Sequence, residues 1–139
     1  MLLIEPDPDL ARTWAQEFTN ASHDVIVTNS IREAIASIRD GGVDVVVLDS
    51  YDGSAGILEF VAALQRLPDA PPIVLVSSRP DGPSISARIG AATFVAKPCD
   101  ADELVREVGR IAGMMVRSVM PMDFSIDEET TGQDMRAFE

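Results

Sequence analysis

The sequence of 139 residues is 46% hydrophobic, 24% charged and 5% aromatic, a composition typical of one soluble globular domain. Its single cysteine cannot close an internal disulfide, and one histidine leaves no ligand set for a structural zinc site. A net charge of −12 disfavours nucleic acid and anionic membrane surfaces as partners, and no apolar stretch reaches the ~18 residues that a membrane span needs. We therefore expect a cytoplasmic domain that binds neither nucleic acid nor membrane.

Short apolar runs rich in β-branched residues predict the strands. They are residues 2–4, 25–27, 43–48 and 73–76, and a fifth strand is expected directly before Lys97. Because these runs are continuous rather than alternating, they indicate strands that are covered on both faces.

The first helix is predicted from its cap and its apolar spacing. Asp7 is a suitable N-cap, and Pro8 follows it at the first helical position. Leu10, Trp14 and Phe18 then recur four residues apart, which is the spacing of one buried helix face. In this pattern Trp14 is most simply a core residue.

The later helices have signals of different strength. Two capping boxes begin helices, Ser30 with Glu33 and Asp100 with Glu103. A further helix is predicted over residues 57–66, before Pro68. Residues 82–89 give the weakest helical pattern, with one or two mobile turns as the alternative.

Strands that alternate with helices of this length imply βαβ crossovers and a doubly wound α/β fold with a five-stranded parallel sheet. The alternation closes near residue 117, which gives a domain of residues 1–117. Residues 118–139 hold six acids and one base and show no apolar period. We expect these residues to form an acidic, flexible tail or linker.

Polar side chains follow the strands at the end of the sheet where ligands bind in such folds. They are Glu5 and Asp7 after the first strand, Asp49 after the third, Ser77-Ser78 after the fourth and Lys97-Pro98 after the fifth. A carboxylate, a hydroxyl and further acids can bind a divalent cation, and the carboxylate can accept a phosphoryl group. A lysine and a metal would offset charge on the transferring oxygens. Each residue alone has an ordinary explanation as a turn or cap, so the joint arrangement carries the hypothesis.

With these residues the chain resembles the response-regulator receiver domains of two-component signalling, over the whole predicted domain. The matches are Asp49 in VVVLDS, Ser77-Ser78 in IVLVSS, and Phe94 before Lys97-Pro98 in GAATFVAKP. The resemblance implies a three-layer, flavodoxin-like fold with strand order 2-1-3-4-5.

The resemblance also implies a role for each matching residue. Asp49 would accept a phosphoryl group from a histidine kinase or a phosphotransfer protein. Lys97 would bridge to Asp49 at rest and to the phosphoryl group afterwards. Ser77 would turn inward to bind the phosphoryl group while Phe94 moves into the space left behind, so that phosphorylation biases a two-state switch.

The implied metal site departs from the family pattern. The family's first strand ends in two acids, of which the second contacts the metal, whereas this chain reads Glu5-Pro6. Magnesium would be held by Glu5, Asp49 and the backbone carbonyl of Tyr51. Asp7 is a further candidate ligand, although it is equally suited to cap the first helix. Because proline has no carboxylate, magnesium binding is expected to be weak or absent.

Several functions are open at this point. The chain is either a receiver that is phosphorylated on Asp49 or a pseudo-receiver that binds partners without phosphorylation. An aspartyl-phosphate phosphohydrolase of the haloacid dehalogenase type is less favoured, because Tyr51 stands where that chemistry needs a second acid. A flavin-binding flavodoxin is disfavoured because Glu5, Asp7 and Asp9 would repel a phosphate. We expect a phosphoryl acceptor with at most slow autodephosphorylation, and no turnover enzyme.

The last helix offers a candidate surface for a partner. Arg106, Arg110 and Arg117 form a cationic stripe on an acidic protein, where a downstream protein or a second copy of the chain would dock. The alternative is a solvated face on which these arginines pair with Glu103 and Glu107.

Overall fold

The chain alternates strands and helices from its first residues onward, as the sequence predicts. The computed structural model describes residues 1–49 and 55–119, with side chains described to residue 113 except at residue 55. Within these residues the strands are β1 (Leu2–Ile4), β2 (Ile26–Thr28), β3 (Val46–Asp49), β4 (Ile73–Ser77) and β5 (Thr93–Ala96). The helices are α1 (Pro8–Asn20), α2 (Ile31–Arg39), α3 (Ala55–Leu64), α4 (Gly82–Ile89) and α5 (Ala101–Val119).

The strands form one parallel sheet in the order β2-β1-β3-β4-β5. This is the order that the resemblance implied, and it is confirmed. In its register Ile4 pairs with Leu48, and Asp49 pairs with Val76. The carboxyl ends of β1, β3, β4 and β5 therefore meet along one edge of the sheet.

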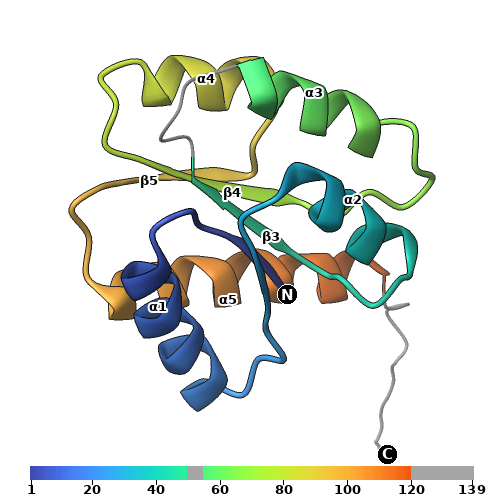
Figure 1. Cartoon of the computed structure of the whole chain (residues 1–139). Helices are drawn as coiled ribbons and strands as arrows, with labels where there is room; N and C mark the ends of the chain where they lie inside the picture. The colour runs from blue at the N-terminus through green and yellow to red at the C-terminus, as the bar shows by residue number, and fades with distance from the viewer. Residues whose placement is uncertain (50–54, 120–139) are drawn as a thin grey trace, which may run out of the picture.

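Helices cover both faces of the sheet and complete three layers (Figure 1). Side chains of α2, α3 and α4 pack in one cluster with one face of the sheet, around Leu48, Phe60 and Leu75. Side chains of α1 and α5 pack in a second cluster on the other face, around Trp14 and Leu104. The central strands β1, β3 and β4 are buried throughout, which fits their continuous apolar runs.

The two-sided cover predicted for the strands is wrong for β2. Ile26 and Val27 are each 46% exposed. Strand β2 lies at the edge of the sheet, where one side has no neighbouring strand, and it is only three residues long. The apolar run of residues 43–48 also predicts too long a strand, because β3 begins at Val46.

The helix signals are largely confirmed. Asp7 caps α1, and its side chain accepts hydrogen bonds from the backbone N–H groups of Asp9 and Leu10. Ser30 caps α2 by accepting from the N–H of Glu33. The reciprocal half of that capping box is absent from this described region, because the Glu33 carboxylate accepts from the Thr28 hydroxyl instead. The weakly predicted segment 82–89 is a helix, ended by Gly90 in the left-handed conformation.

Among the described residues, no helix combines the length and the apolar character that crossing a membrane would require.

Candidate functional site

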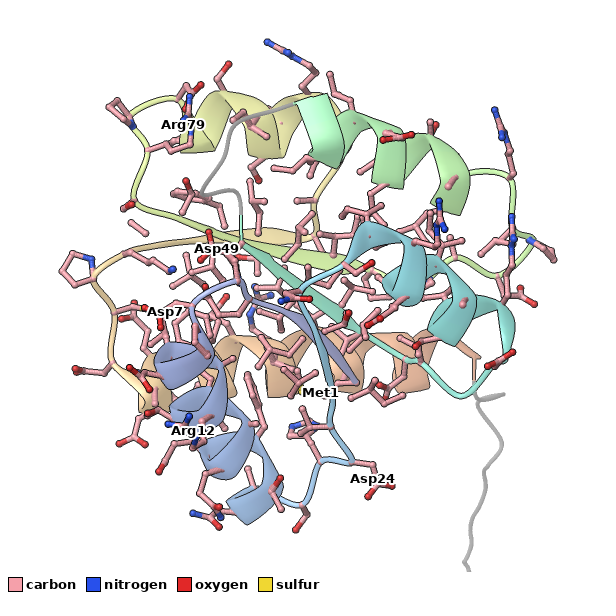
Figure 2. The ribbon with its side chains drawn as sticks, viewed as in Figure 1. Met1, Asp7, Arg12, Asp24, Asp49 and Arg79 are labelled. Carbon is pink, nitrogen blue, oxygen red and sulfur yellow. The ribbon has the colours of Figure 1, made fainter. Side chains whose placement is uncertain are left out.

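Three of the predicted residues meet at the carboxyl edge of the sheet. Glu5 directly follows β1, Asp49 is the last residue of β3, and Lys97 directly follows β5. Because β1 and β3 are hydrogen-bonded neighbours in parallel register, their carboxyl ends place Glu5 and Asp49 side by side. Figure 2 shows Asp49 at the carboxyl end of β3.

Lys97 joins the two carboxylates. Its Nζ atom lies 3.1 Å from Oε1 of Glu5 and forms a direct ion pair with Oδ2 of Asp49. The Glu5 and Asp49 side chains are only 1% and 2% exposed, whereas that of Lys97 is 18% exposed. The site thus holds two buried carboxylates against one ammonium group. Burying charge without a partner is costly, so this ion pair is what makes the arrangement compatible with a folded protein.

Burial changes the proton affinity of the groups in this site. Desolvation and the neighbouring Asp49 raise the pKa of Glu5 to about 7. Burial alone would lower the pKa of Lys97, but its hydrogen bonds to Asp49 and Glu5 outweigh this effect and hold the pKa above its ordinary value. Lys97 is therefore an ammonium ion at neutral pH, whereas the carboxyl group of Glu5 keeps its proton to a higher pH than an ordinary glutamate does.

The backbone after β1 uses the second oxygen of Glu5. Oε2 of Glu5 accepts a hydrogen bond from the N–H of Asp7 at 3.1 Å. The Asp7 carboxylate points in a different direction, because its Oδ1 atom caps α1, 3.0 Å from the N–H of Asp9. Of the two interpretations of Asp7, the helix cap is therefore the one that the structure shows.

Ser77 and Phe94 lie on the neighbouring strands β4 and β5. Ser77 is buried, and its Oγ atom accepts a hydrogen bond from the N–H of Arg79 at 3.0 Å. Phe94 is half-buried and packs against the cluster formed with α2, α3 and α4. Its ring contacts the backbone of Gly82, at the beginning of α4, so closely that a side chain there would collide with it. The hydroxyl, the ring and the start of α4 thus form one packed group.

The donor set can be compared with the needs of magnesium. Two carboxylates, those of Glu5 and Asp49, supply the hard oxygen atoms that this ion prefers, and magnesium commonly retains several waters beside one or two carboxylates. Pro6 adds no oxygen donor from its side chain, and Tyr51 lies outside the described residues. Within the described part of the chain, no three His, Cys, Asp or Glu residues are grouped as a metal site. The residues present fit a largely hydrated ion that is held by two carboxylates.

The arginine stripe of α5 is partly neutralised. Arg110 forms an ion pair with Glu107, with 2.9 Å between its NH2 nitrogen and Oε1. This contact is the one that the solvated-face interpretation predicted. Arg106 is exposed, and the side chain of Arg117 lies outside the described residues.

Two residues of the site were not identified as such from the sequence. Trp14 was predicted only as core, and it is indeed buried, but its ring also faces Nζ of Lys97, 5.2 Å from the ring centroid. The sequence indicates Gly82 only as the beginning of the least strongly predicted helix. For Trp14 the available signal was a large aromatic residue nearly two turns into a helix that follows an acidic strand end, whereas for Gly82 the sequence held none.

Comparison with known proteins agrees with this geometry. The family model "Response regulator receiver domain" matches residues 1–109. The transcriptional regulatory protein TcrA of Mycobacterium tuberculosis is 28% identical over 109 residues, which cover 75% of this chain and 42% of that protein. The C4-dicarboxylate transport transcriptional regulatory protein DctD of Rhizobium meliloti is 33% identical over 113 residues, which cover 79% of this chain and 24% of that protein. The chain thus spans less than half the length of either relative.

The fold is also found in solved structures. A CheY-like response regulator receiver domain protein of Methanospirillum hungatei superimposes with a TM-score of 0.71 at 16% sequence identity, over 84% of this chain and 95% of that one. At this identity the likeness concerns the fold, whereas the family assignment rests on the match to residues 1–109. By that match, and with an acidic site at the carboxyl edge of a sheet in the order β2-β1-β3-β4-β5, the chain belongs to the response regulator receiver domain family.

Proposed function

We propose that Asp49 accepts a phosphoryl group from a phosphohistidine of a histidine kinase or a phosphotransfer protein, and that the domain then signals by protein contact. The observation that carries this proposal is the ion pair between Lys97 and the buried carboxylate of Asp49 at the end of β3. In the transfer an Asp49 oxygen forms a bond to phosphorus, the phosphorus–nitrogen bond breaks, and the histidine keeps the bonding electrons. The product is an acyl phosphate on Asp49.

The neighbouring residues suit this transfer. Negative charge at Asp49 increases when the phosphoryl group arrives, and the Lys97 ammonium already lies beside it. Ser77 would exchange its hydrogen bond from the Arg79 N–H for one to the phosphoryl group. Phe94, which contacts the start of α4, would follow that movement and change the surface that partners bind.

Magnesium is part of this proposal in a limited way. Glu5 and Asp49 would hold the ion, together with the backbone carbonyl of Tyr51. When bound, it would neutralise charge on the transferring oxygens, a contribution of several kcal/mol in phosphoryl transfer. Pro6 stands where the family pattern has its second acid, and it brings no carboxylate to the site. We therefore expect weak binding of magnesium.

A second function is favoured by one observation. The carboxylate of Asp7, which directly follows Pro6, caps α1, and Lys97 already neutralises part of the charge of Glu5 and Asp49. A site whose charge is already partly neutralised by Lys97 has less need of a cation and can remain in one state without it. On this reading the domain is a pseudo-receiver that binds partners without phosphorylation.

Small-molecule phosphorylation separates the two functions. The protein would be incubated with acetyl phosphate, with and without magnesium, and its intact mass would be measured. The receiver predicts a magnesium-dependent gain of one phosphoryl group that is lost in Asp49→Asn, a variant of nearly the same shape. A folded wild type that gains no phosphoryl group at any magnesium concentration overturns the receiver proposal and supports the pseudo-receiver.

A further inference from the structure

The only tryptophan of the chain lies beside its only lysine. Trp14 belongs to α1 and is 3% exposed, within the cluster that also holds Leu3, Val47 and Leu104. Lys97 follows β5, and its Nζ atom is 5.2 Å from the centroid of the Trp14 ring. The structure therefore brings an aromatic face from one element to an ammonium group from another.

The ammonium group faces the ring in addition to pairing with the two carboxylates. Lysine has three N–H donors on a flexible four-carbon stem, and Glu5 and Asp49 account for two of them. The attraction between a cation and an aromatic face is strongest for tryptophan and increases where water is excluded. The 18% exposure of the Lys97 side chain indicates that water is largely excluded here.

We propose that Trp14 is a positioning residue for Lys97: its ring holds the ammonium group against Asp49 and so prepares the site for phosphoryl acceptance. The second part of this inference, that the site is prepared for phosphoryl acceptance, rests on the proposed function. Trp14 itself touches none of the reacting atoms, and it acts through Lys97. Leucine would keep this position apolar without attracting the ammonium group, although it is smaller than tryptophan and leaves part of the space empty.

The test uses the fact that the chain has one lysine. Lysine labelled with ¹³C at Cε gives a single NMR signal from Lys97, so no assignment is needed. The ring of Trp14 should move the Hε resonances of wild-type Lys97 away from their ordinary position, and Trp14→Leu should abolish this displacement. Trp14→Phe, which keeps a weaker aromatic face, should give an intermediate signal.

Phe18→Leu is the matched control. Phe18 is a fully buried aromatic residue of the same helix and cluster, and it has no described contact with Lys97. The rate of phosphorylation by acetyl phosphate, corrected for the folded fraction, should fall about fivefold in Trp14→Leu, less in Trp14→Phe, and not in Phe18→Leu. Urea unfolding of every variant supplies the folded fractions.

Each outcome is decisive for one part of the inference. An unchanged Lys97 signal in Trp14→Leu overturns the positioning role. Equal corrected rates in Trp14→Leu and Phe18→Leu reduce Trp14 to a packing residue. A wild type that takes no phosphoryl group overturns the proposed function instead, and the Lys97 signal then still decides whether the Trp14 ring lies against the ammonium group.

Discussion

Gly82 and Phe94 touch so closely that a Cβ atom on Gly82 would lie 2.8 Å from Cε1 of the ring and 3.2 Å from Cβ of Ser77. Gly82 is the first residue of α4, Phe94 belongs to β5 and Ser77 ends β4. The absence of a side chain at one helix terminus thus permits the half-buried position of the aromatic ring. Any movement of Ser77 or Phe94 must be accommodated at this contact.

Gly82→Ala is expected to destabilise the protein by ~1–3 kcal/mol, because the new methyl group must displace the ring or the start of the helix. The free energy of unfolding in urea measures this loss. The control is Gly109→Ala, in the interior of α5, where an added Cβ meets nothing within 4 Å. The free energy of unfolding of that variant should rise by roughly 0.5–1 kcal/mol, since alanine has a higher helix propensity than glycine.

Combining Gly82→Ala with Phe94→Leu identifies the cause. If the collision with the ring is responsible, the double variant should be more stable than the sum of the two single effects predicts. Strictly additive losses would show that the methyl group disturbs something other than the ring.

The stability of the protein should depend on pH through Glu5. Burial raises the pKa of this carboxyl group to about 7 in the folded state, against an ordinary value of 4.5. Between these values the folded protein binds more protons than the unfolded chain, so the free energy of unfolding falls as pH rises from 4.5 to 7. The shift corresponds to about 3 kcal/mol over that interval.

Glu5→Gln isolates this contribution. Glutamine retains an oxygen that can accept from Lys97 and from the N–H of Asp7, but it does not titrate. Urea unfolding at a series of pH values between 5 and 8 should show a shallower decline for the variant than for the wild type. Parallel curves for the two proteins would mean that Glu5 is not the group responsible.

Replacing Lys97 by methionine leaves Asp49 and Glu5 without their cation. Removing one partner of a buried ion pair costs about 3–5 kcal/mol, so Lys97→Met should be strongly destabilised at pH 8. At pH 5.5 the loss should be smaller, because the carboxyl group of Glu5, whose pKa burial raises to about 7, is then largely protonated and needs no cation. Arg12→Met removes an ion pair of two exposed side chains, 75% and 88% exposed, and should change stability little at either pH. A loss in Lys97→Met that is independent of pH would contradict this account.

Pro6→Asp should increase magnesium affinity. The substitution supplies a carboxylate directly after Glu5, where the family pattern has its second acid, and we expect at least about tenfold tighter binding, equivalent to ~1.4 kcal/mol. Isothermal titration with magnesium measures the change. Pro6→Ala removes the ring without adding an oxygen, and a gain of similar size in that variant would assign the effect to the backbone.

The sequence predicts the scaffold of the site because the relevant signals are local. The proximity of Glu5, Asp49 and Lys97 is predictable because each lies at the end of a predicted strand, and the carboxyl ends of parallel strands share one edge of the sheet. The role of Asp7 as the N-cap of α1 is likewise predicted by the proline that follows it.

The remaining features depend on distances between elements. The contact between Trp14 and Lys97 joins residues far apart in the chain, and helical spacing specifies only that Trp14 is buried. The exposure of Ile26 and Val27 follows from the place of β2 at the sheet edge, which apolar content does not encode. The side chain of Glu33 likewise bonds to Thr28 rather than to the helix end.

The cap at the beginning of α1 links helix stability to ion binding. Oδ1 of Asp7 accepts from the N–H groups of Asp9 and Leu10, and losing such a cap costs a helix about 1 kcal/mol. A cation that recruited Oδ1 would compete with these N–H groups for it, and loss of the cap would weaken the binding of that cation roughly fivefold. A firm first turn of α1 and tight binding of a cation therefore compete for the same oxygen of Asp7, and Pro6 beside it offers no carboxylate to relieve that competition.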